Sequence, residues 1–160
     1  MRVVIAAVGR LKDGADRELL DRYLKRLTQS GRSQSLSPID VIEIPEGRGD
    51  TAPLRQADEG ARLLKLVAGI EVLVALDETG RSYSSRTFAD LIAKQRDQGS
   101  QSLGFLIGGP DGHGDDVRHK AAFKLSLGPM TLPHGLARIV LTEQLYRVTT
   151  ILAGHPYHRD

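Results

Sequence analysis

Apolar residues occur along the 160-residue chain in two alternating patterns. Continuous apolar runs that contain β-branched residues are typical of buried strands. Such runs cover residues 2–8, 39–44, 71–77, 102–109 and 123–127. Between them, apolar side chains that recur every three or four residues predict helices. These helices cover residues 14–27, 51–67, about 85–98, 115–122 and 136–152.

Strands that alternate with helices of this length predict an α/β fold with a mainly parallel sheet flanked by helices on both faces. The length suits one domain over residues 1–160. Ligands of such sheets bind at the carboxyl ends of the strands. Here those ends are residues 76–80, 107–112 and 127–132, and we expect a ligand site there.

The composition excludes several kinds of chemistry. The chain has no cysteine, so it cannot form disulfides, thiolate metal sites or a cysteine nucleophile. Its apolar runs are all shorter than the roughly 20 residues that cross a bilayer. The first residues lack the long apolar stretch of a signal peptide. We therefore expect a cytoplasmic protein with no membrane partner.

Charge is distributed unevenly, although the net charge is only +2. Residues 1–32 contain eight Lys or Arg and four Asp or Glu, whereas the rest of the chain has a small acidic excess. The first predicted helix carries Arg17, Arg22, Lys25 and Arg26. These side chains form either an ordinary solvated helix face or a patch that binds nucleic acid phosphates.

Three predicted loops contain residue types that can bind a ligand. The loop 107–114 has four glycines but matches neither the dinucleotide fingerprint nor the P-loop, so a tight turn without a ligand is the alternative. Asp77 ends a strand and either caps a turn or serves a site. The segment 126–135 contains Pro129 and Pro133 and cannot be a central strand. Its backbone groups and aliphatic side chains would suit a flat heterocycle such as adenine.

The last predicted helix, residues 136–152, is apolar on more than one face. A helix of this kind is either buried in its own domain or shared with a partner, and we favour a two-fold homodimer. Glu143 and Arg147 have the spacing of a helical ion pair. Arg138 and Arg147 are secondary candidates for contact with nucleic acid, with structural pairing as the alternative.

The last six residues, HPYHRD, concentrate reactive side chains where chains are usually frayed. They include two His, one Tyr and one Arg. A solvated tail is one interpretation. A metal site is disfavoured because no third group of ligands accompanies the two His, and we expect no metal. A functional tail is the remaining interpretation.

Taken together, the motifs of this chain resemble the RlmH family of bacterial SPOUT-class rRNA methyltransferases. They are DRYLKRL (21–27), LDETG (76–80) with SS (84–85), FLIGGPDG (105–112), MTLPH (130–134), EQLYR (143–147) and HPYHR (155–159). Their combination is specific and covers nearly the whole chain. Two positions depart from the family pattern, since His113 stands where Leu is usual and Gly128 where Ser is common.

The resemblance implies a SPOUT α/β-knot methyltransferase fold, in which the C-terminal segment forms a trefoil knot, a rare exception among protein chains. It also implies a homodimer that binds S-adenosyl-L-methionine and methylates N3 of a pseudouridine in the 23S rRNA of the large ribosomal subunit. Carried over by motif, the cofactor contacts are Leu76, Gly108, Leu127, Gly128, Pro129, Met130, Thr131 and Leu132.

The tail then receives the catalytic roles. His158 is expected to be the general base, because imidazole titrates near neutral pH. Tyr157 would orient that ring, and Arg159 would offset negative charge on the substrate. His155 could do the work of His158. The alternatives are a knot-fold methyltransferase for another RNA and a non-catalytic RNA- or nucleotide-binding module.

Overall fold

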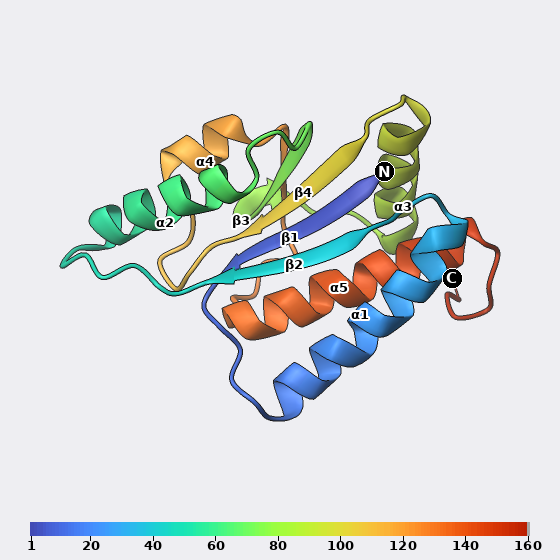
Figure 1. The fold of residues 1–160 in the computed structure, drawn as a ribbon, viewed down its shortest axis with the longest axis horizontal. Helices are drawn as coiled ribbons and strands as arrows, with labels where there is room; N and C mark the ends of the chain where they lie inside the picture. The colour runs from blue at the N-terminus through green and yellow to red at the C-terminus, as the bar shows by residue number, and fades with distance from the viewer. Residues whose placement is uncertain (160) are drawn as a thin grey trace.

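The computed structural model describes residues 1–159, which form a five-stranded sheet (Figure 1). The strands are β1 (Arg2–Val8), β2 (Ile39–Ile44), β3 (Val72–Arg81), β4 (Ser102–Ile107) and β5 (Phe123–Leu125). They lie in the order β2-β1-β4-β3-β5, and all neighbours are parallel. The predicted α/β fold with a parallel sheet is confirmed.

Helices cover both faces of this sheet. They are α1 (Ala15–Ser33), α2 (Ala52–Leu66), α3 (Ser85–Asp97), α4 (Asp115–Lys120) and α5 (His134–Leu152). In Figure 1, α1 and α5 lie side by side below the sheet, and α2 and α4 lie above it. Ile5 of β1 belongs to the core between the sheet and helices α1, α3 and α5. Its neighbour Ala6 belongs to the core between the sheet and helices α2 and α4. None of the helices within residues 1–159 is long and apolar enough to cross a membrane.

Some element ends differ from the prediction. Helix α1 continues to Ser33, because packing against α5 stabilises a polar last turn; the Ser30 hydroxyl lies 2.6 Å from the Thr149 hydroxyl. Strand β3 continues to Arg81 instead of ending at residue 77, because Leu125 of β5 pairs both with Leu76 and, after a register shift, with Arg81. The other strands begin and end within two residues of their predicted bounds.

The parallel arrangement places the carboxyl ends of β3, β4 and β5 at one edge of the sheet. Residues 126–133 connect β5 to α5. The three segments that were expected to bind a ligand therefore meet at this edge.

Candidate active site

A cavity of about 640 Å³ opens at this carboxyl edge. Its volume lies in the range of small-molecule and cofactor sites. The walls come from the ends of β3 and β4 and from the segment that joins β5 to α5. All eight residues expected to contact a cofactor line it, namely Leu76, Gly108, Leu127, Gly128, Pro129, Met130, Thr131 and Leu132. The fold thus brings together residues from three distant parts of the sequence.

The segment 127–132 carries backbone groups that can bind a ligand. Among the described residues, the N–H groups of Leu127, Met130, Thr131 and Leu132 form no hydrogen bond. Gly128 has a φ of 126°, which strains any other residue type. Free backbone donors between aliphatic side chains suit the edge and the faces of a heterocycle.

The glycine-rich loop forms another wall. It folds back on itself, since a Cβ atom at Gly108 would lie only 2.9 Å from the carbonyl carbon of Gly112. The Gly112 N–H donates to the Gly109 carbonyl oxygen at 2.9 Å. Arg55 Nε donates to Asp111 at 2.7 Å and pins the loop to α2. The loop is therefore a tight turn that also lines the cavity.

Asp77 is a buried carboxylate beside the cavity. Its side chain is 2% exposed and accepts hydrogen bonds from the Thr79 hydroxyl at 2.6 Å and from Arg118 Nε at 2.7 Å. Burial opposes ionisation, but these hydrogen bonds outweigh it and lower the pKa of Asp77 to about 2. The Thr79 N–H also donates to Asp77 at 2.9 Å, so Asp77 makes the turn cap that was one of its two alternatives, and it also lines the cavity.

His113, which departs from the family pattern, is buried at the same cavity. Its Nε2 donates to the Leu106 carbonyl oxygen at 3.0 Å. Burial lowers the pKa of His113, so the ring is neutral at physiological pH.

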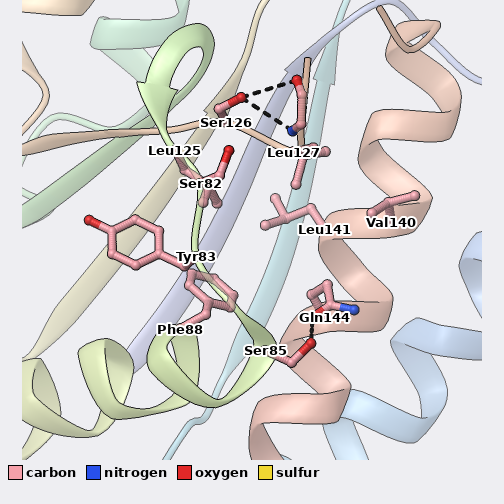
Figure 2. Close-up of a pocket in the computed structure, with 11 residues that line it drawn as sticks. Ser82, Tyr83, Ser85, Phe88, Leu125, Ser126, Leu127, Val140, Leu141 and Gln144 are labelled. Atoms are coloured by element: carbon pink, nitrogen blue, oxygen red, sulfur yellow. Dashed lines mark hydrogen bonds between the residues drawn. The ribbon is translucent and has the colours of Figure 1, made fainter. Parts of the chain in front are cut away.

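A smaller cavity of about 270 Å³ shares the wall formed by residues 125–128 (Figure 2). It lies between α3 and α5, which the Ser85 hydroxyl bridges by donating to Gln144 Oε1 at 2.8 Å. Val140 lines this cavity and is 37% exposed. The apolar surface of α5 therefore continues outward beside the larger cavity.

The tail folds back onto α5. The Tyr157 hydroxyl donates to Glu143 Oε1 at 2.9 Å, and its ring centroid lies 4.8 Å from that of Tyr146. The Arg147 guanidinium carbon lies 4.7 Å from the centroid of the Tyr157 ring, and Arg147 Nη2 donates to Glu143 Oε1 at 2.6 Å. Burial and the hydrogen bond to Glu143 both raise the pKa of Tyr157, so the phenol stays protonated. Tyr157 is therefore docked rather than solvated.

The other tail residues surround this phenol. His158 is half-buried, and its Nδ1 lies 3.4 Å from Arg147 Nη1. His155 is exposed, and its Nδ1 accepts a hydrogen bond from the Tyr157 N–H at 3.1 Å. Arg159 is exposed. Within residues 1–159 no group of three or more His, Asp or Glu side chains could hold a metal ion.

The docked tail lies apart from the larger cavity of its own chain. No tail residue among 155–159 lines that cavity. His134 begins α5 and lines the cavity, whereas Glu143, which holds Tyr157, comes nine residues later. At about 1.5 Å per residue, that places Glu143 about 14 Å further along the helix. Within one chain, the expected cofactor residues and the expected catalytic residues form two separate groups.

The predicted basic patch is only partly exposed. Arg22, Lys25 and Arg26 project from α1 into solvent. Arg17 instead turns inward, where its Nη2 donates to the Leu11 carbonyl oxygen and pairs with Glu43, both at 2.7 Å. Arg147 pairs with Glu143, as its spacing predicts.

Arg138 does not reach the surface, which corrects its place among the RNA-binding candidates. Its side chain is 0% exposed and donates to the carbonyl oxygens of Val8 and Gly9 at 3.1 and 2.7 Å. It also pairs with Glu43. The sequence alone did not identify Glu43 as the partner of Arg138. The signal that could have done so is its position as a carboxylate within the apolar strand IDVIEI. Arg118, the partner of Asp77, had no comparable signal.

A parallel α/β sheet with a cofactor-sized cavity at its carboxyl edge defines the class of small-molecule-binding α/β proteins. The chain belongs to the SPOUT methyltransferases, since residues 1–158 match the family described as "Predicted SPOUT methyltransferase".

Curated relatives match the whole chain. The "Ribosomal RNA large subunit methyltransferase H" of Xanthobacter autotrophicus is 52% identical over 159 residues, which cover 99% of each chain. The protein of the same name from Brucella anthropi is 49% identical and covers 100% of both chains. A solved structure of a probable methylase family protein from Haemophilus influenzae has a TM-score of 0.52 at 10% identity and covers 99% of this chain and 70% of that one. This last likeness concerns the fold alone.

Proposed function

We propose that the chain is an S-adenosyl-L-methionine-dependent methyltransferase that modifies N3 of a pseudouridine in the 23S rRNA, in the cytoplasm. The names of the relatives support large-subunit rRNA as the substrate. The target base and atom rest on the resemblance of the motifs, HPYHR above all. The observation that carries the proposal is the single cavity lined by all eight expected cofactor residues.

The cavity suits S-adenosyl-L-methionine in both size and chemistry. The free N–H groups of residues 130–132 can bind the edge of the adenine ring, while Leu76 and Leu127 offer aliphatic contact to its faces. Gly128 leaves the backbone of this wall clear of a side chain, and its φ of 126° would strain any other residue type. When bound, the cofactor supplies a methyl group on a positively charged sulfonium.

The tail residues would act on the acceptor. N3–H of pseudouridine is a weak acid, and the nitrogen becomes a good nucleophile as its proton leaves. His158 takes that proton, and His155 is the alternative base. Tyr157 holds the tail in place through Glu143 and Arg147. Arg159 offsets the negative charge that develops on the imide oxygens.

A homodimer would unite the two groups of site residues. The tail lies apart from its own cavity, so the tail of one chain would close the cavity of its partner. Exposed apolar side chains on the cavity wall and on α5 support this arrangement, because such patches mark interaction surfaces. Leu136 and Val140 of α5 are 41% and 37% exposed, and Met130 on the cavity wall is 81% exposed.

We also propose that residues 1–160 form one SPOUT domain whose C-terminal segment is knotted. The family match over residues 1–158 supports this fold, and the last strand, β5, packs closely against β3. A Cβ atom at Gly80 would lie 2.7 Å from the carbonyl carbon of Lys124, so no side chain fits between the two segments.

Two measurements test the function. Calorimetry with S-adenosyl-L-methionine should give stoichiometric binding. Labelled methyl should then pass to ribosomes, separated subunits or free rRNA, and the modified base should be N3-methylpseudouridine. Binding without transfer to any RNA would identify a non-catalytic module. Transfer to tRNA instead would identify a methyltransferase for another RNA, and absence of cofactor binding would contradict the proposal.

A further inference from the structure

Three of the four tyrosines gather where α1, α5 and the tail meet. The ring centroids of Tyr23 on α1 and Tyr146 on α5 lie 6.4 Å apart, and the rings are tilted by 43°. Tyr157 contacts Tyr146 from the tail side. Figure 1 shows α1 and α5, which carry Tyr23 and Tyr146, lying side by side. The proposed function uses only Tyr157, so the other two rings have no role so far.

Arg26 lies over both of these rings. Its guanidinium carbon is 5.8 Å from the centroid of Tyr23 and 5.9 Å from that of Tyr146, within the range of cation–π contact. The side chain is exposed. Among the described residues its guanidinium forms no ion pair and no hydrogen bond, unlike Arg17 and Arg147. The rings therefore position this cation, while its N–H groups remain available to a ligand.

We propose that Arg26, backed by Tyr23 and Tyr146, is a stacking platform for an unpaired nucleobase of the RNA substrate, distinct from the base that is methylated. This inference rests on the proposed function. Unpaired RNA bases stack on aromatic rings and on guanidinium planes. An exposed guanidinium held over two aromatic rings can offer a flat surface of this kind.

The geometry favours a base over a phosphate as the ligand. Arg22 and Lys25 on the same helix are exposed cations that can bind phosphates without any fixed orientation. Within residues 1–159, by contrast, Arg26 is the one exposed cation of α1 that contacts aromatic rings. Because Tyr146 also touches Tyr157, a base on the platform would anchor the RNA strand beside the tail.

Arg26→Lys tests the platform, because lysine keeps the charge and removes the flat guanidinium. The matched control is Arg32→Lys, which alters an exposed arginine on the same helix that has no aromatic contact among the described residues. The probes are a fluorescein-labelled 12-nucleotide oligouridylate and an abasic oligomer of equal length and charge, with binding followed by anisotropy.

The wild-type chain should bind the base-containing oligomer more tightly than the abasic one, by roughly 5- to 100-fold for one stacked base. Arg26→Lys should lose this preference while its salt dependence stays unchanged, and Arg32→Lys should keep the preference. A wild type without the preference, or an Arg26→Lys variant that retains it, overturns the platform. Methyl transfer to ribosomes by the same wild-type sample tests the proposed function separately.

Discussion

Glu143→Gln removes one charge from the cluster that holds the tail and hardly changes the side-chain shape. In the structure Glu143 Oε1 accepts the Tyr157 hydroxyl at 2.9 Å and Arg147 Nη2 at 2.6 Å. The Glu143 side chain is only 15% exposed, so solvent screens these interactions weakly. The variant keeps an acceptor oxygen for Tyr157 but loses the negative charge.

The expected magnitude follows from these contacts. A hydrogen bond to a charged group contributes about 1.5–3 kcal/mol and a neutral one about 0.5–1.5 kcal/mol, so the substitution costs the Tyr157 contact about 1–2 kcal/mol. The helical ion pair with Arg147 adds about 0.3–0.5 kcal/mol. A total of about 1.5–2.5 kcal/mol raises the equilibrium constant for undocking of the tail about 10- to 70-fold.

Two assays measure this effect. Tyrosine ¹³Cζ NMR follows the phenols during a pH titration, in which an ordinary tyrosine ionises near pH ~10. Burial and Glu143 raise the pKa of Tyr157, so its phenol should ionise above that pH, and Glu143→Gln should lower that pKa. In methyl transfer to ribosomes, kcat should fall with the docked fraction of the tail, by at most about 70-fold. Affinity for S-adenosyl-L-methionine should stay unchanged, because Glu143 does not line the larger cavity.

Glu18→Gln is the control, since it removes the same charge from an exposed position on α1. Tyr157→Phe deletes the hydroxyl and keeps the ring contacts, so combining it with Glu143→Gln should cost less than the sum of the two single changes. An unchanged pKa of Tyr157 in Glu143→Gln would refute the reasoning. So would a loss of cofactor affinity as large as the loss of kcat.

Three further substitutions probe other parts of the molecule. Arg138→Met leaves two buried carbonyl oxygens without their donor and Glu43 with Arg17 as its remaining partner, so the free energy of unfolding in urea should fall by about 3–5 kcal/mol; a loss below about 1 kcal/mol would contradict this. The lowered pKa of Asp77, about 2 against an ordinary 3.8, stabilises the folded chain by about 2 kcal/mol above pH ~4, and this contribution is lost as the pH falls toward 2. Asp77→Asn should therefore be less stable at neutral pH and lack this acid-dependent loss in denaturation series. His158→Ala should lower turnover by about 10²–10⁴-fold with unchanged cofactor binding, and full turnover would remove its role as base.

The strands could be predicted because their composition is dictated by burial on both faces. The run RVVIAAV has buried residues from Val3 to Val8, and no other arrangement would cover so many apolar side chains. The last turn of α1 could not be predicted, because its sequence is polar and α5 stabilises it from outside. The bulge in β3 depends on pairing with β5, more than 40 residues later, and leaves no local pattern.

Some parts of the candidate site could likewise be predicted from the sequence, and others could not. The cofactor loops could be found because glycines, prolines and strand ends are local signals, and a parallel sheet brings strand ends together. The inward turn of Arg138 could not be found from helical spacing, since it depends on Glu43, 95 positions earlier in the chain. Its position among the apolar residues of α5 was consistent with either a surface contact or a buried ion pair. Only the tertiary packing distinguishes the two.

Helix α5 connects both groups of site residues and therefore sets their spacing. Its first turn lines the larger cavity through His134 and Ala137, and its later turns hold the tail through Glu143 and Tyr146. A helix packed on the sheet and on α1 is rigid, so a chain cannot shorten this distance without unpacking its core. We therefore expect the docked tail to meet the cofactor cavity of another chain, as the proposed homodimer requires. The same rigidity would hold the tail ready for a partner, because Glu143 docks Tyr157 in the single chain before any partner binds.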